Sequence, residues 1–143
     1  MTLPQSDRGS ATLELAVLSL GLLMLISVVV ALGRFQVTAH AVEDAARAAA
    51  RQASIARSAQ DAQANAHSAA VTTLAAQGLQ CTEMTVSLDT SGFTKSPGDP
   101  AQVSATVHCS VLLSETALPG LPGSRDVTAT FTSPIDTFRE SAP

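Results

Sequence analysis

Residues 15–32 form an uncharged apolar run, and this run limits what the chain can fold into more than any other feature. As an α-helix, its 18 residues would extend about 27 Å, which nearly matches the hydrocarbon core of a bilayer. The apolar part of a cleaved secretory signal is usually about 7 to 15 residues long and ends at a small-residue cleavage site. Gly33, Arg34 and Phe35 provide no such site. We therefore predict a retained transmembrane helix over residues 10–33.

The composition narrows the function of the rest of the chain. With 143 residues and a net charge of −4, there is room for one small domain, and 8 basic residues against 12 acidic ones argue against nucleic-acid binding. No tryptophan or tyrosine is available to line an active site. No Ser-His-Asp arrangement, paired-carboxylate motif or phosphate-binding glycine loop is recognisable. We expect no catalytic residue, cofactor or small-molecule substrate, and hence no enzyme.

The three histidines do not suggest a metal site. His40 and His67 are 27 residues apart, and neither has a second ligand at helical spacing. His108 lies in an alternating segment where a solvent-facing strand position is expected. We predict no metal ligands.

Glu14 stands directly before the apolar run. An unpaired carboxylate that entered lipid would cost several kcal/mol. Glu14 must therefore stay at headgroup depth, near the N-terminus of the helix where the macrodipole favours negative charge, or find a partner.

The residues around Glu14 favour a partner. A short hydrophilic leader ends at Gly9, and Glu14 follows five residues later, which resembles the prepilin processing signal of type IV pilin-like proteins. Gly33-Arg34 and the alanine- and arginine-rich residues 45–51 are similar to the N-terminal signature of TadE-like pseudopilins from tight-adherence pilus systems. The resemblance covers about residues 8–51. Leu15 is a departure, because many relatives carry an aromatic residue beside the acidic one.

The resemblance implies cleavage after Gly9 by a prepilin peptidase, with residues 1–9 as the leader. Gly9 has no side chain to obstruct the enzyme. The new α-amine on Ser10 would be a cation that pairs with Glu14 of a neighbouring subunit. The implied partners are membrane lipid, the peptidase, and other pilins or Tad secretion components. The implied location is the cytoplasmic membrane, with incorporation into the pilus left open.

Residues 34–78 are predicted to form a helical stalk. Of the 38 residues from 39 to 76, 17 are alanine and none is proline, which strongly favours helix. We expect the membrane helix to continue to about Gln77 and to end at Gly78. The stalk would pack against neighbouring subunits. The alternatives are a solvated spacer, or a helix that packs back on its own head only near Val71, Leu74 and Leu79.

Residues 79–143 are predicted to form a small β head. Apolar and polar residues alternate over 84–88, 103–111 and 127–131, which is typical of half-buried strands, and most of the proline and glycine lies between these segments. The expected fold class is α+β: a transmembrane helix, a helical stalk and an antiparallel three-stranded sheet.

Cys81 and Cys109 are the only cysteines, and we interpret them as a disulfide. Two buried thiols or a metal pair are the alternatives. A loop of this length closed by a disulfide could stabilise the fold by about 3 to 4 kcal/mol and implies an oxidising compartment. Pairing the two cysteines directly across the strands would place Met84 and Val86 opposite polar residues. A shift of one residue corrects this, so Cys81 should precede the first strand.

The orientation of the chain rests on conflicting signals. Arg34, Arg47 and Arg51 follow the span while Arg8 precedes it, so the basic-residue rule alone places the C-terminal part in the cytoplasm. The cysteines and the resemblance favour the opposite, and we predict an extracytoplasmic head. The predicted function is a minor pilin-like subunit in tight-adherence pilus assembly. The alternative is a single-pass anchored extracytoplasmic binding domain, with no role in a filament, in which the Gly9 to Glu14 spacing is coincidental.

Overall fold

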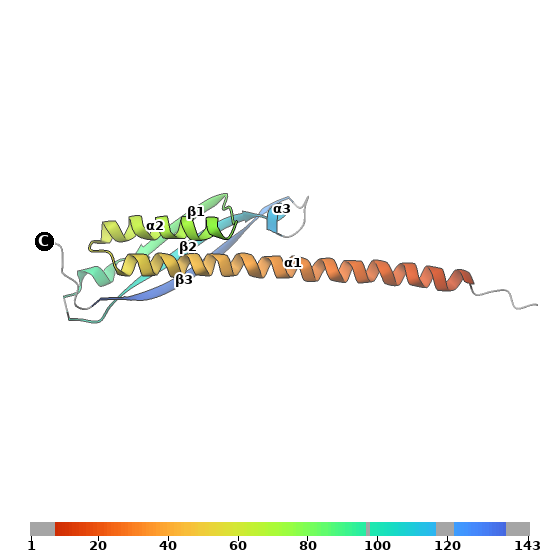
Figure 1. The fold of residues 1–143 in the computed structure, drawn as a ribbon, viewed down its shortest axis with the longest axis horizontal. Coiled ribbons are helices and arrows are strands. Elements are labelled where there is room, and N and C mark those ends of the chain that lie inside the picture. Colours follow the sequence, from red (N-terminus) through yellow and green to blue (C-terminus); the bar gives the residue numbers. More distant parts are fainter. Residues whose placement is uncertain (1–7, 97, 117–121, 137–143) are drawn as a thin grey trace, which may run out of the picture.

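A computed structural model describes residues 8–96, 98–116 and 122–136 (Figure 1). Two helices are followed by a three-stranded antiparallel sheet, so the predicted α+β class is confirmed. In chain order the elements are α1 (Arg8–Ser54), α2 (Ala59–Ala76), β1 (Glu83–Asp89), the 3-10 helix η1 (Ser91–Thr94), β2 (Ala101–Leu112), the short helix α3 (Leu113–Thr116) and β3 (Ser124–Ile135).

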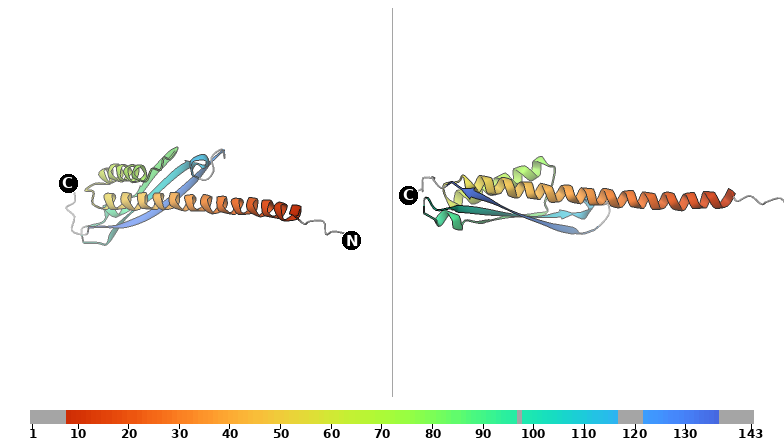
Figure 2. Two further views of the ribbon diagram at one scale, coloured as in Figure 1. Left: turned by 45° about the vertical axis from the view of Figure 1, so that its right-hand side comes forward. Right: turned by 90° about the horizontal axis from the view of Figure 1, so that it is seen from below.

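The N-terminal half of α1 projects alone from the rest of the molecule (Figures 1 and 2). Residues 11–30 are all exposed, Ala31 is half-buried, and Thr38 is the first buried residue. Gly33 does not interrupt the helix. The helix over Ala11–Ser54 is long and apolar enough to cross a membrane, and none of its most apolar window is buried by the protein.

The prediction of one helix to Gln77 is wrong, because the chain turns at residues 55–58 and α2 packs back along α1. Ser58 caps α2: its hydroxyl oxygen accepts from the Asp61 N–H (3.1 Å) and also donates to the Asp61 carboxylate (2.8 Å). A side chain that satisfies the first amides of a helix lets a new helix begin there.

The predicted end of the helical region at Gly78 is confirmed. Gly78 has φ +69°, a left-handed conformation that glycine adopts without strain. The Leu79 N–H donates to the Leu74 carbonyl and the Gly78 N–H to the Ala75 carbonyl, both at 3.0 Å. This is the hydrogen-bond pattern of a Schellman cap, and it directs the chain out of α2 toward the sheet.

The sheet has the strand order β1-β2-β3, and its register places apolar residues opposite one another. Met84 lies opposite Cys109, and Val86 opposite Val107, which in turn faces Ala129 of β3. Cys109 pairs with Met84, which is three residues after Cys81, whereas we expected a shift of one residue from direct pairing of the two cysteines. An odd shift keeps the same faces together, so the predicted faces hold, and Cys81 precedes β1 as expected.

The two helices cover one face of the sheet (Figure 2), so residues 34–78 form the helical layer of the head and not a separate stalk. Each helix turns a row of small side chains inward, while the strands contribute valines. On α1 the buried residues are Thr38, Ala41, Val42, Ala45, Ala46, Ala49, Ala50 and Ala53; on α2 they are Ala62, Ala66, Ala70 and Leu74. Alanine at these positions lets the helix backbones approach closely.

The connection from β1 to β2 is held by local contacts. The Ser91 N–H donates to the Asp89 carboxylate at 3.0 Å, and this hydrogen bond lowers the pKa of Asp89 below its ordinary value. Gly92 is buried against the backbone of Gln102, where a Cβ atom would collide with the Gln102 carbonyl.

We expect Ala66→Leu to destabilise the head by about 1 to 3 kcal/mol, because a larger side chain at a fully buried helix contact forces the helices apart. Ala64→Leu, on the exposed side of the same helix, is the matched control and should leave stability nearly unchanged. The free energy of unfolding in detergent solution measures both. Equal stability of the two variants would contradict the packing described here.

Candidate functional site

Gly9, Ser10 and Glu14 all lie in the first two turns of α1. Ser10 and Glu14 are four residues apart, a spacing that places two positions on the same face of a helix. The Glu14 side chain is exposed, and it is the only charged side chain between Gly9 and Gly33. The structure therefore brings the three predicted residues to one end of α1, next to the apolar surface.

The apolar surface of α1 has no cover from the rest of the described chain. Its large side chains from residue 13 to residue 32 are 49 to 71 % exposed. A soluble monomer rarely leaves so continuous an apolar surface in water. This half of the helix is therefore suited to contact lipid or other apolar helices. The exposed large side chains are Leu13, Leu15, Val17, Leu18, Leu20, Leu22, Leu23, Met24, Leu25, Ile26, Val28, Val29, Val30 and Leu32.

Arg47 links α1 to the edge of the sheet. Its guanidinium carbon lies 5.3 Å from the centroid of the Phe131 ring on β3, and an Nη1 group donates to the Asp44 carboxylate at 3.5 Å. The other carboxylate oxygen of Asp44 accepts from the Gln77 side-chain amide at 3.3 Å. Arg47, in the alanine- and arginine-rich residues 45–51, thus has a packing role in the head. The sequence analysis did not predict this role.

A second arginine contact marks the point where α1 enters the head. The Arg125 guanidinium carbon, on β3, lies 4.6 Å from the centroid of the Phe35 ring. Cation–π contacts of this kind contribute about 0.5 to 1 kcal/mol at exposed sites. Nothing in the sequence pairs residue 35 with residue 125, because the contact depends on how the sheet lies against the helix.

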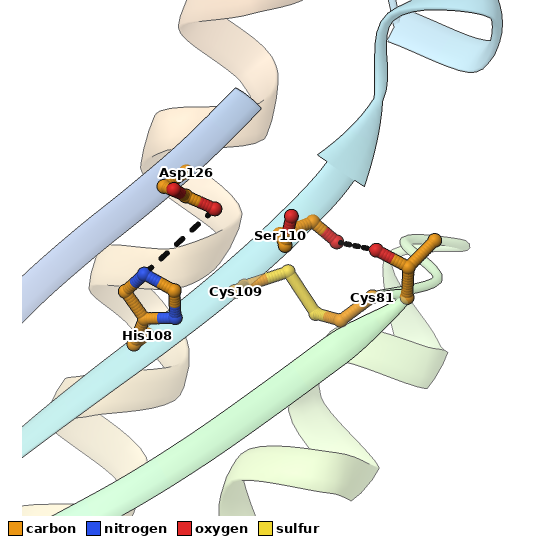
Figure 3. Close-up of a disulfide and its surroundings, with 6 residues drawn as sticks. Cys81, His108, Cys109, Ser110 and Asp126 are labelled. Atoms are coloured by element: carbon orange, nitrogen blue, oxygen red, sulfur yellow. Dashed lines mark hydrogen bonds and ion pairs between the residues drawn. A yellow bond between two sulfur atoms is a disulfide. The ribbon is translucent and has the colours of Figure 1, made fainter. Parts of the chain in front are cut away.

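Cys81 and Cys109 are joined by a disulfide between the segment after α2 and the middle strand (Figure 3). Cys109 is fully buried and Cys81 is half-buried. Beside them, the Thr82 N–H and hydroxyl both donate to the Ser110 carbonyl, at 2.8 and 2.9 Å. The disulfide and these two hydrogen bonds fasten the end of the helical layer to β2.

His108 lies on the sheet face opposite to the helices. Its Nε2 atom is 3.8 Å from an Asp126 carboxylate oxygen on β3 (Figure 3), and Thr106 and Thr130 share a hydroxyl hydrogen bond of 2.9 Å on the same face. On α1, His40 pairs with Glu43 at 3.4 Å. Within the described residues, no three His, Cys, Asp or Glu side chains gather as a metal site would require.

An open groove of about 700 Å³ runs between α1 and α2. Ile55, at its end, is 74 % exposed. The residues that line it include no carboxylate, histidine or cysteine, so the groove holds none of the usual acid, base or thiol groups. They are Ala48, Arg51, Gln52, Ile55, Asn65, Ser68, Ala69, Thr72 and Thr73.

Comparison with known proteins gives a match in the N-terminal part of the chain. The family model described as TadE-like protein matches residues 9–51, and the resemblance inferred from the sequence is confirmed over these residues. The matched segment lies within α1 and ends before α2. No curated protein and no solved structure matches the chain.

We expect loss of the disulfide to lower the free energy of unfolding by about 3 to 4 kcal/mol, because the closed loop of 28 residues restricts the unfolded chain. Chemical denaturation of the oxidised and the reduced protein measures this difference while both sulfur atoms remain present. The double variant Cys81→Ala plus Cys109→Ala should fall at or below the reduced protein, since it also loses the packing of a buried side chain. A reduced protein as stable as the oxidised one would refute this role.

Proposed function

We propose that this chain, whose residues 9–51 are TadE-like, is a membrane-anchored minor pilin-like subunit that takes part in assembly of a tight-adherence pilus. The observation that carries the proposal is the position of the matched segment. It covers the exposed apolar half of α1 together with Glu14, and it continues into the helical layer of the head. The family match indicates a role associated with the pilus system, and the geometry of α1 supports assembly through the anchor.

The proposed location is the cytoplasmic membrane, with a single span and the head outside the cytoplasm. The Cys81–Cys109 disulfide supports this orientation, because disulfides persist in oxidising compartments. The basic residues after the span favour the opposite orientation. We propose the orientation that the disulfide favours, because the disulfide joins the helical layer to the sheet and the fold of the head is expected to depend on it.

Assembly would proceed through the processed N-terminus. Cleavage after Gly9 by a prepilin peptidase would leave an α-amine on Ser10, and this cation would pair with Glu14 of a neighbouring subunit. In lipid, where water is scarce, an unpaired carboxylate is costly, and pairing with the amine removes that cost. The exposed apolar side chains around Glu14 would pack against the helix of the neighbour. The pair would therefore set the axial register of the two neighbouring helices.

The chain would act through contacts and not through catalysis. The partners that we propose are membrane lipid, the prepilin peptidase, and other pilins or Tad secretion components. Neither the groove between α1 and α2 nor the outer face of the sheet supports an assignment as an active site, and we propose no enzymatic activity and no cofactor.

We expect the mature protein to begin at Ser10, and Gly9→Leu to block its processing, because a bulky side chain would obstruct the peptidase at the scissile bond. Gly21→Leu is the matched control: a side chain at Gly21 meets no atom within 4 Å, and the site is distant from the cleavage point. N-terminal mass analysis of protein extracted from membranes, with and without the peptidase, measures the outcome. A chain that still begins at Met1 or Thr2 would favour the alternative, an anchored binding domain with no role in a filament.

We expect Glu14→Ala and Glu14→Gln to leave insertion and cleavage intact, since each removes a charge from the end of an apolar span. Either substitution should reduce co-purification with partner pilins by about tenfold or more, which corresponds to about 1.4 kcal/mol, and should reduce piliation. Glu43→Ala, at an exposed position of the head, is the control and should keep both at wild-type level. Wild-type piliation by Glu14→Ala at equal protein level would show that Glu14 is only an interfacial carboxylate.

A further inference from the structure

Arg125 lies at the same level along α1 as the end of the apolar run. Its guanidinium stacks on Phe35 at 4.6 Å, and Phe35 follows the last residue of that run, Leu32, by three positions. Arg34 is exposed and lies beside Phe35 in the helix. The contact thus brings a basic residue from the start of β3 to the level of α1 at which the first basic residue after the apolar run, Arg34, also lies.

The head also begins to cover α1 inside the apolar run. Residues 11–30 are exposed, whereas Ala31 is half-buried. The short helix α3 contacts α1, and it lies at the end of the sheet that points along the projecting half of α1 (Figure 1). This end of the head is therefore the end closest to the apolar run.

Two leucines lie at this end of the head. Leu112 is the last residue of β2 and is 37 % exposed. Leu113 begins α3, and its N–H donates to the Gly123 carbonyl at 3.0 Å, which holds the two ends of the connection together. The end nearest to the span thus carries both apolar and basic side chains.

A bilayer around residues 15–32 would place these groups at the membrane surface. The hydrocarbon core would end near Leu32, and Arg34 and Arg125 would lie at the level of the lipid phosphates. Guanidinium groups form paired, charge-assisted hydrogen bonds with phosphate, and apolar side chains of a surface that lies on a bilayer insert at the boundary between headgroups and acyl chains. Among the residues that the structure describes, no carboxylate forms an ion pair with Arg34 or Arg125.

We propose that Arg34, Phe35, Leu112, Leu113 and Arg125 form a lipid-binding surface, which we call the membrane-facing end. It holds the head against the phospholipid headgroups of the bilayer that α1 spans. This inference rests on the proposed anchoring of α1. The span of α1 would be the first attachment of the chain to the membrane, and the membrane-facing end would be a second one, made by the folded head itself.

Depth-dependent fluorescence quenching tests the proposal, because the chain contains no tryptophan or tyrosine and an introduced indole is the only such reporter. The full chain would carry Leu112→Trp at the membrane-facing end, Leu22→Trp within the span, or Ile55→Trp in the turn that follows the far end of α1. Each variant is reconstituted in vesicles of phosphatidylcholine and phosphatidylglycerol in equal parts, with and without bromine on the upper acyl chains. We expect brominated lipid to reduce the emission of Leu112→Trp and Leu22→Trp and to leave that of Ile55→Trp unchanged.

The arginines are tested in the Leu112→Trp background. Adding Arg34→Gln and Arg125→Gln should remove most of the quenching at this position and shift the emission to the red. Adding Arg51→Gln and Arg57→Gln makes the same change of net charge at exposed positions away from the membrane-facing end, and should leave the quenching unchanged. Circular dichroism and an intact disulfide establish that each variant is folded.

The outcomes separate this inference from the proposed anchoring. Quenching of Leu22→Trp with none of Leu112→Trp would overturn the lipid-binding surface and leave the anchor intact. Absence of quenching in both variants would overturn the anchoring, and the lipid-binding surface with it. A blue-shifted Leu112→Trp emission that brominated lipid does not reduce would show that protein, and not lipid, covers this end.

Discussion

Close packing of small side chains between α1, α2 and the sheet determines how the rest of the molecule is arranged. Among the described residues, the largest side chains that are fully buried are Val42, Val103, Val107 and Cys109. Small side chains bury little area each, and hydrophobic stabilisation scales with the area removed from water. The head therefore depends on many short contacts at once and on the Cys81–Cys109 disulfide. The exposed half of α1 contributes nothing to this core and remains available for lipid or partner helices.

The sequence was sufficient to predict the parts of the fold that local patterns determine. Alternation with a period of two identified all three strands, because it places the apolar residues of each strand on one face. It also identified the buried faces, because a shift of one residue would turn valine to solvent and serine inward. Gly78 was recognisable as the end of the helical region. The length of the uncharged run was enough to predict a candidate membrane span. The residues around Gly9 and Glu14 were enough to show the resemblance to TadE-like proteins.

Contacts between distant parts of the chain were not predictable. The turn at residues 55–58 lies between two alanine-rich segments of nearly identical composition, so helix propensity does not distinguish one long helix from two. The available signal for two helices is the pair Ser58 and Asp61, whose spacing fits the N-cap of a helix. The positions of Arg47 on Phe131 and of Arg125 on Phe35 depend on how the sheet lies across α1, which no local pattern records.

The continuity of α1 has a mechanical consequence. The helix is 47 residues long, and no proline or hinge separates its projecting half from the half that packs in the head. A pull on the projecting half therefore acts on the core along the axis of the helix, as a shearing load that all the side-chain contacts between α1 and the sheet resist together. The disulfide joins β2 to the segment after α2 and lies outside this direct load path. Under tension, the first part to yield would be the sliding contact between α1 and the strands, while the cross-linked sheet and the end of α2 would stay together.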